Sequence, residues 1–222
     1  MRVMSLPPDE ARFFGLLVEL DRGGDREART ALFEKIAATA RFRAARPIEG
    51  ETFRYLSHWY IPAIRELAGI PGFRPDPAWI ARQLRPKITP AKAKAALEVL
   101  DQLGMVRVAE DGTIQLSDGD FVTPHEVAGL AVHNYHRGML QRSQDSIDAF
   151  SPSDRHPGAV TVRVPASRVS ELKSEVTAFL ERILDLSAAS PDDTEASDGQ
   201  QVVQVNVQLF PMSTSVQPPE ST

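Results

Sequence analysis

The sequence predicts a mostly α-helical protein with small β elements, an α+β chain with a winged-helix core. Two closely spaced helix starts stand at Asp76-Pro77 and Thr89-Pro90, and an alternating apolar pattern around an Asp-Gly turn follows the second helix. Apolar residues at spacings of three and four recur through much of the remaining chain. A long helix and a C-terminal strand–helix–strand unit complete the predicted architecture.

Composition limits the class of protein. The chain has 222 residues, 42% of them hydrophobic, and a formal net charge of −5, so it can form one large or two modest domains. Its lack of cysteine excludes disulfides and thiolate chemistry and fits a reducing compartment. No apolar run approaches a membrane span, and the N-terminus lacks a signal-peptide pattern. We expect a soluble, cytoplasmic protein without membrane partners.

Residues 1–50 form the expected N-terminal helical segment, with two helices separated by residues 21–25 (DRGGD). The first apolar face contains Phe13, Phe14, Leu16, Leu17 and Leu20, and the second contains Ala31, Leu32, Ile36 and Ala40. Such short helices do not bury themselves alone. We expect them to pack on the winged-helix unit or on a partner.

Residues 51–122 form the expected winged-helix domain. Its first helix should run from about Phe53 to Gly69. Each of the next two helices begins with an N-cap residue before proline, which suits the first helical position. One face of the helix from Thr89 to Leu103 is apolar and should be buried, and Gly104 should end it.

A two-stranded wing is expected directly after this helix. Asp111-Gly112 is a strong hairpin turn signal, because both central positions of such turns favour positive φ. The flanking apolar residues are Met105, Val106, Val108, Ile114 and Leu116.

Residues 123–213 should form a long helix and a strand–helix–strand domain, followed by a disordered tail at 214–222. Thr123-Pro124 opens the long helix, which should continue to about Phe150. Its apolar side contains Val132, His136, Met139, Leu140, Ser143, Ile147 and Phe150. The strands are expected at 160–164 and 203–209, where valines alternate with polar residues, and the intervening helix at 169–186.

His133 and His136 stand three residues apart, a spacing that can place two imidazoles on one metal. No nearby side chain provides a convincing third ligand, so we interpret His136 as a packed, hydrogen-bonded core histidine and expect no metal. No catalytic group can be assigned from spacing. We therefore expect neither an enzyme nor a cofactor.

The candidate functional residues surround the start of the helix at 89–103, which would act as a recognition helix in a DNA major groove. No acidic residue lies between Arg82 and Lys94, so this stretch could neutralise phosphates. The candidate DNA contacts are Arg82, Arg85, Lys87, Thr89, Lys92, Lys94 and Arg107. Glu98 and Asp101 interrupt the basic patch, and no base-reading Arg or Asn lies near Lys92. Weak, backbone-directed DNA contact is expected.

Two alternatives stay open. In one, the winged fold serves dimerisation or protein contact, and the long helix and C-terminal sheet carry the function. In the other, the chain is a small-molecule sensor with a pocket between the winged unit and the C-terminal part. The expected partners are therefore DNA and either a second copy or a related regulator.

The chain resembles a large family of uncharacterised bacterial proteins, in which a phage-repressor-type helix-turn-helix domain precedes a winged-helix domain of unknown function. The resemblance covers nearly everything from Phe53 to Ser213. The matching stretches are Tyr55 to Leu67 (YLSHWYIPAIREL), Asp76 to Gly104 (DPAWIARQLRPKITPAKAKAALEVLDQLG), His136 to Leu140 (HRGML), Asp154-Arg155, and Val203 to Ser213 (VQVNVQLFPMS).

This resemblance implies a transcriptional regulator and brings no established ligand or activity. Residues 8–20 resemble the end of the family's first domain, and the helix-turn-helix that should precede them is missing from this sequence. If the true start lies upstream, the whole protein binds DNA through that domain. If the chain is a headless relative, it should modulate full-length relatives.

Overall fold

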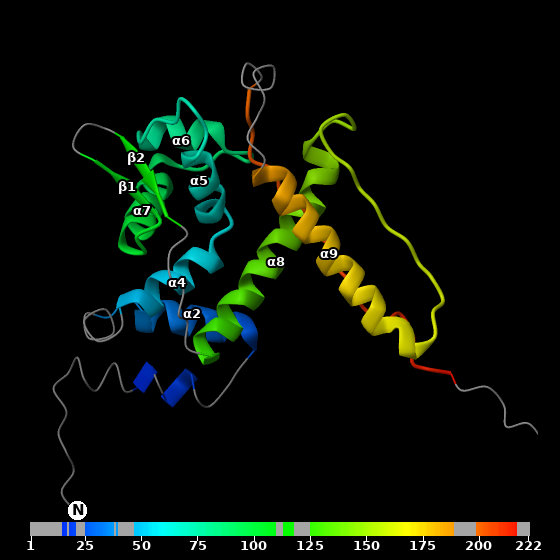
Figure 1. Cartoon of the computed structure of the whole chain (residues 1–222). Helices are drawn as coiled ribbons and strands as arrows, with labels where there is room; N and C mark the ends of the chain where they lie inside the picture. Colours follow the sequence, from blue (N-terminus) through cyan, green and yellow to red (C-terminus); the bar gives the residue numbers. More distant parts are fainter. Residues whose placement is uncertain are drawn as a thin grey trace, which may run out of the picture. The chain divides into compact units, whose positions relative to one another are not determined.

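The computed structural model describes residues 15–16, 18–20, 25–37, 39, 47–109, 113–117, 125–188 and 199–216 (Figure 1). The chain divides into two compact units, Met1–Met139 and Leu140–Thr222. Helices dominate, and the described β structure is a single two-stranded antiparallel sheet. The predicted mostly α, α+β class is confirmed.

Residues 15–16 and 18–20 of the first unit are helical. The elements that follow them in this unit are α2 (Arg26–Ala37), α4 (Pro47–Ser57), α5 (Tyr60–Ala68), α6 (Pro77–Gln83), α7 (Pro90–Gln102), β1 (Val106–Val108) and β2 (Ile114–Leu116). Helix α8 (His125–Ala149) begins in this unit and ends in the second, which also contains the 3-10 turn η1 (Ala166–Arg168) and α9 (Val169–Ala188).

The predicted N-caps at Asp76 and Thr89 are confirmed. The Asp76 carboxylate accepts a hydrogen bond from the Trp79 backbone N–H at 2.6 Å, and the Thr89 hydroxyl accepts one from the Lys92 N–H at 3.3 Å. These bonds satisfy N–H groups that have no partner inside the helix. At the other end of α7, Gly104 adopts φ +66°, a conformation that favours glycine, and terminates the helix as predicted.

The helix expected from Phe53 to Gly69 is instead two helices, α4 and α5, with a break at His58 and Trp59. Pro62 explains the break, because a proline ring clashes with the carbonyl four residues earlier, which here belongs to His58. The His58 carbonyl accepts a hydrogen bond from the Ile61 N–H at 3.0 Å instead. A new helix therefore starts at Tyr60.

Helices α5, α6 and α7 share one core with the hairpin. Helix α7 contacts α4, α5, α6 and β1. The most deeply buried residues of this core are Ile61, Ile64, Ile80, Ala93, Ala96, Val99, Leu100, Met105 and Val106. Strands β1 and β2 pair with Val106 opposite Leu116 and Val108 opposite Ile114, as the hairpin pattern predicts. The predicted turn residues 110–112 lie outside the described residues.

The N-terminal helices do pack on the rest of the first unit. Phe33 and Phe53 are buried, with ring centroids 4.4 Å apart, and Ile36 and Ala131 lie in the same apolar cluster. Leu16 and Leu20 pack against it. This cluster joins α2, α4 and α8, so the short helices gain stability from tertiary contacts.

Histidine 136 is exposed, and its prediction as a packed core residue is wrong. On the predicted apolar side of α8, Met139 is buried, whereas Val132, Leu140 and Ile147 are exposed. Periodicity identifies one face of a helix but does not establish that a neighbour covers it. The predicted cap at Thr123-Pro124 lies outside the described residues.

Helix α9 confirms the predicted helix, but the strands expected on either side of it do not form. Residues 160–164 and 203–209 are drawn as extended traces rather than arrows (Figure 1), and neither has a strand assignment. A strand needs a neighbouring strand for its backbone hydrogen bonds. The expected strand–helix–strand unit is therefore absent from the described chain. In the predicted disordered tail, residues 217–222 lie outside the described range.

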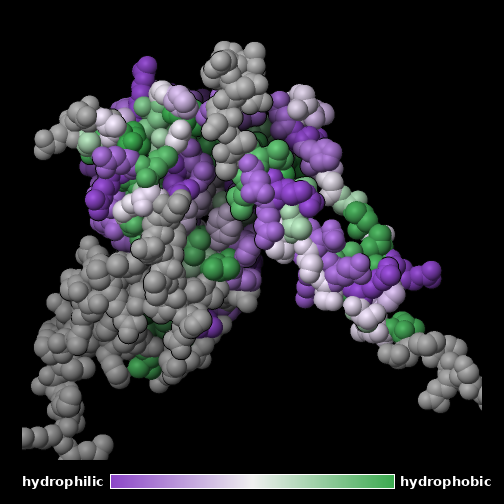
Figure 2. All heavy atoms as spheres, viewed as in Figure 1, coloured by the Kyte–Doolittle hydropathy of each residue, from purple (hydrophilic) through white to green (hydrophobic). Residues whose placement is uncertain are grey.

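Hydrophobic side chains of the second unit lie at the surface. They appear as green spheres among hydrophilic ones in Figure 2. No helix in the described part of the chain has both the length and the apolar character of a membrane span.

Candidate nucleic-acid interface

The candidate site is built by two consecutive helices. Helices α6 and α7 contact each other, and the Ile88 N–H in the connecting turn donates to the Ala81 carbonyl of α6 at 3.3 Å. Ile80 and Leu84 are buried beside this turn. The turn is therefore anchored to the core from its apolar side.

The structure brings most of the predicted contacts together around this turn. Arg82 closes α6, Arg85 and Lys87 lie in the turn, and Lys92 and Lys94 lie in the first two turns of α7; all are exposed. Among the described residues, no carboxylate forms an ion pair with any of these five side chains. Their charges face solvent and are available to an anionic partner.

Two of the predicted DNA-contact residues, Thr89 and Arg107, differ from the other five in their structural environment. Thr89 is exposed, but its hydroxyl oxygen caps α7 by accepting the Lys92 N–H. Arg107 lies on β1, where it is exposed and stands opposite Gln115 of β2. Arg107 thus belongs to the hairpin rather than to the helical turn.

Charge changes sign along the exposed face of α7. Lys92 and Lys94 lie near its N-terminus, whereas Glu98 and Asp101 are exposed further along the helix. The helix dipole also makes the N-terminal end positive. An anion should therefore meet α7 at its first turns.

Aromatic side chains extend the site beyond its predicted residues. The Lys92 ammonium lies 5.9 Å from the centroid of the Tyr60 ring, and the His58 ring stacks on Tyr60 with centroids 5.4 Å apart. Trp59 meets Tyr60 edge-on at 5.9 Å. Residues 58–60 (HWY) are not among the residues predicted for the site, because the sequence places them inside one long helix. In the structure, Tyr60 lies beside Lys92 of α7.

Burial lowers the pKa of His58 below 6.5, Glu34 acts in the opposite direction, and Arg54 and Lys92 lower this pKa further. Burial also raises the pKa of the Tyr60 hydroxyl above 10.0, with Arg54 opposing the shift. Desolvation disfavours the charged form of both groups. At neutral pH, His58 is therefore a neutral ring beside the lysines.

A metal or small-molecule site finds less support in the described residues. They contain no group of three His, Cys, Asp or Glu side chains that could hold a metal ion. A shallow hollow of about 320 Å³ lies beside α2, α4 and α8, lined by Thr30, Ala31, Glu34, Ser57, Asn134 and Arg137. Asn134 spans it by donating to Thr30 at 3.2 Å and to Ser57 at 3.4 Å. Thr30, Ser57 and Asn134 are therefore joined by hydrogen bonds across the hollow.

Among curated proteins and among solved structures, none matches this chain. A family described as a domain of unknown function, DUF4423, matches residues 39–212, which contain every helix from α4 to α9 and the β1–β2 hairpin. The chain belongs to this family.

Proposed function

We propose that this protein is a DNA-associated transcriptional regulator in which α5, α6, α7 and the β1–β2 hairpin act as a winged helix. The observation that supports this proposal best is the exposed basic cluster of the α6–α7 turn, formed by Arg82, Arg85, Lys87, Lys92 and Lys94. Three helices followed by a hairpin are the order of elements in winged-helix proteins, and a helix-turn-helix places its second helix in the major groove.

The polarity of α7 defines how it would approach DNA. Lys92 and Lys94 would contact phosphates, whereas Glu98 and Asp101 would be repelled by them. The helix should therefore enter the groove with its N-terminal turns. Arg107 on the hairpin would supply a further phosphate contact.

The distribution of charge is compatible with such a contact. The acidic excess of the chain lies in residues 140–222, so the first unit is close to neutral overall. An exposed basic cluster on a neutral unit can attract DNA despite the net charge of −5.

The proposed contact is directed at the DNA backbone. The first two turns of α7 present alanines and lysines and contain no Arg, Asn or Gln that could read a base edge. Phosphate contacts alone give weak binding that depends strongly on salt.

Duplex-DNA binding by the full chain, measured by fluorescence anisotropy across a salt series, tests the proposal. The logarithm of the affinity should fall with the logarithm of salt concentration, with a slope of about −0.9 per phosphate neutralised. The double variant Lys92→Ala, Lys94→Ala should weaken binding and flatten the slope by roughly two units.

A matched control removes the same charge elsewhere. Lys173 and Arg182 are exposed on α9, and the double variant Lys173→Ala, Arg182→Ala should keep the original slope. Equal flattening in both double variants would show an effect of net charge rather than of the α6–α7 turn. A full chain without salt-sensitive DNA binding would overturn the proposed function.

A second candidate function is a protein-interaction or dimerisation module. It is favoured by the second unit, where none of the described side chains is buried. A stable oligomer without DNA affinity would select this candidate.

A further inference from the structure

The second unit lacks a core of its own among the described residues. From Leu140 to Val216, no described side chain is buried, although the stretch is rich in large apolar residues. Helix α9 carries many of them, and among the described elements only the adjoining turn η1 makes an extensive contact with it. Because a folded unit is stabilised mainly by apolar burial, the apolar surface of α9 calls for a partner.

The apolar residues of α9 follow a heptad repeat. In a heptad, labelled abcdefg, two helices meet along positions a and d. The a positions of α9 hold β-branched residues and the d positions hold Leu or Phe. They are Val169, Val176 and Ile183 at a, and Leu172, Phe179 and Leu186 at d. Three successive heptads of this composition are typical of a helix that packs along another helix.

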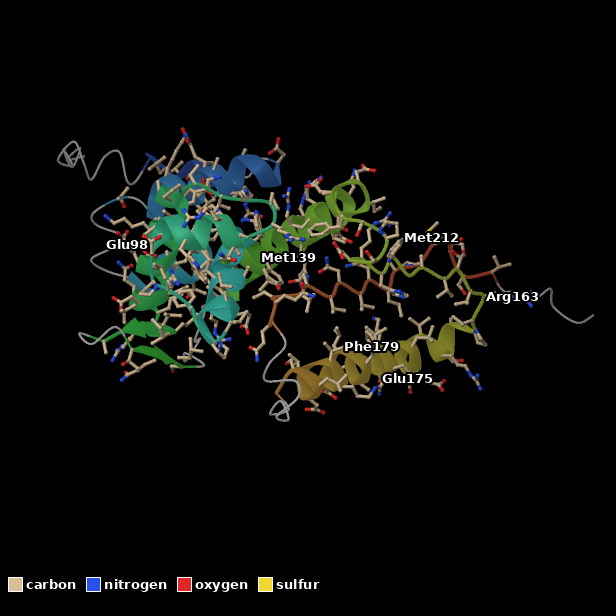
Figure 3. The ribbon with its side chains drawn as sticks, turned by 90° about the horizontal axis from the view of Figure 1, so that it is seen from above. Glu98, Met139, Arg163, Glu175, Phe179 and Met212 are labelled. Carbon is tan, nitrogen blue, oxygen red and sulfur yellow. The ribbon has the colours of Figure 1, made fainter. Side chains whose placement is uncertain are left out.

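These six side chains, which we call the α9 seam, are incompletely covered. None of them is buried, and Phe179 and Leu186 are 41% and 73% exposed. Figure 3 shows Phe179 and Glu175, which lie one turn apart on α9. The chain itself therefore covers the seam only in part, and a neighbouring helix would complete the burial.

Charged residues flank the seam at position g, where α9 has Glu175 and Arg182. Both side chains are exposed, and neither forms an ion pair within the described chain. Charges at the e and g positions determine which helices pair and in which direction. Position g faces position g of the partner in an antiparallel pair, and position e of the partner in a parallel pair.

We propose that α9 pairs antiparallel with α9 of a second copy of this chain, about a two-fold axis level with the middle of the helix. A two-fold interface uses the same patch on both chains, and the seam is complementary to itself. Full overlap places Val169 opposite Leu186, Leu172 opposite Ile183, and Val176 opposite Phe179 of the other copy. It also brings Glu175 of each copy beside Arg182 of the other.

The charges at position g select this arrangement among the alternatives. Moving one helix along the other by a heptad places Glu175 opposite Glu175 in one direction and Arg182 opposite Arg182 in the other. A parallel pair would place Arg168 opposite Lys173 and leave Glu175 opposite Leu180. Like charges across an interface disfavour the arrangement that brings them together. Of these arrangements, only full antiparallel overlap joins opposite charges.

Cysteine cross-linking tests the pairing and its direction. The chain has no cysteine, so substitutions report without background. Leu172 of one copy would face Ile183 of the other, so coexpressed Leu172→Cys and Ile183→Cys chains should form a covalent dimer on oxidation. Each variant alone should not, because its two cysteines would lie about 16 Å apart along the helix axis, beyond disulfide reach. A parallel pair would give the opposite result.

Charge reversal tests the register. Glu175→Arg should weaken dimerisation on the order of tenfold, because it places arginines together at both ends of the interface. Arg182→Glu should act similarly by joining glutamates. The double variant Glu175→Arg, Arg182→Glu should restore the dimer at an unchanged net charge. Arg182→Ala alone should leave the dimer in place, because one exposed ion pair contributes little by itself.

A pair of adjacent substitutions tests the apolar seam. Light scattering should give twice 24.4 kDa for the unsubstituted chain and 24.4 kDa for Ile183→Asp, which places a carboxylate in the seam. The matched control is Leu184→Asp, because Leu184 is 66% exposed and lies outside the seam. This control should remain dimeric.

Several outcomes would overturn the proposal. These are a monomeric unsubstituted chain, cross-linking of each cysteine variant alone but not of the coexpressed chains, a double charge variant that fails to restore the dimer, or equal dissociation by Ile183→Asp and Leu184→Asp. Far-ultraviolet circular dichroism of every variant separates loss of pairing from loss of helix. DNA binding plays no part in these readouts, so they stand independently of the proposed function.

Discussion

Lys92 at the start of α7 lies over the ring of Tyr60 at the start of α5, with the ammonium 5.9 Å from the ring centroid. A cation over an aromatic face is attracted by the negative charge of that face. This contact ties the basic turn to a helix that begins some thirty residues earlier in the chain. The position of Lys92 therefore depends on the packing of α5 as well as on α7.

A double-mutant cycle should measure this attraction. We expect Tyr60→Ala and Lys92→Met to show a coupling energy of about 0.5–1 kcal/mol in urea unfolding. Tyr60→Phe should keep the coupling, because the aromatic face remains. Trp59 and Trp79 both lie in the first unit, so tryptophan fluorescence reports its unfolding. Coupling lost equally in Tyr60→Phe would assign the effect to the hydroxyl.

Acidification should destabilise the first unit through His58. Burial lowers the pKa of His58 below its ordinary 6.5. As the pH falls, the unfolded chain therefore binds more protons at this residue than the folded chain does. The stability that neutral His58 contributes is fully present above pH 6.5. It is lost as the pH falls toward the pKa that His58 has in the folded chain. In urea titrations from pH 7.5 to pH 5, His58→Gln should lose less stability than the unsubstituted chain. The exposed His156 supplies the control, and His156→Gln should follow the unsubstituted chain.

Removing the cap of α6 should weaken the helix that supports the basic turn. Asp76→Ala deletes the 2.6 Å bond to the Trp79 N–H and should cost about 1 kcal/mol of unfolding free energy. Asp76→Asn should retain most of that stability, because its side-chain oxygen can still accept the bond. Glu98→Ala, at an exposed position inside α7, should change stability by less than about 0.5 kcal/mol. Equal losses in Asp76→Ala and Glu98→Ala would contradict a capping role.

Leu100 should be the strongest single test of the core. It is 0% exposed in the packing of α7, and Leu100→Ala should cost about 2–5 kcal/mol through lost burial and a residual cavity. Leu184 on α9 is 66% exposed, so Leu184→Ala should have little effect on unfolding of the first unit. A small loss at Leu100, measured by tryptophan fluorescence in urea, would mean that the core collapses around the deletion.

Local sequence signals predicted the elements around the basic turn. Asp76-Pro77 and Thr89-Pro90 fix two helix starts, because capping and proline geometry involve only neighbouring residues. Arg82 to Lys94 could be assigned to one surface for the same reason, since all lie within one short stretch of chain. The aromatic residues of this surface could not be assigned from the sequence, because Tyr60 reaches Lys92 only through the packing of α5 on α7.

Periodicity predicted faces but not what covers them. His136 lies on an apolar side of α8, yet it is exposed, because burial depends on a neighbouring element rather than on the helix itself. Pro62 carried the signal for the break at His58, but the apolar spacing from Phe53 to Gly69 favoured one continuous helix.

The sequence by itself determined the helix caps, the hairpin and the alternation of residues 203–209, since each follows from the chemistry of adjacent residues. Tertiary structure decided that α4 and α5 separate, that Lys92 meets Tyr60, and that residues 160–164 and 203–209 do not form strands. Packing and strand pairing join residues far apart in sequence, so their outcome depends on which surfaces meet.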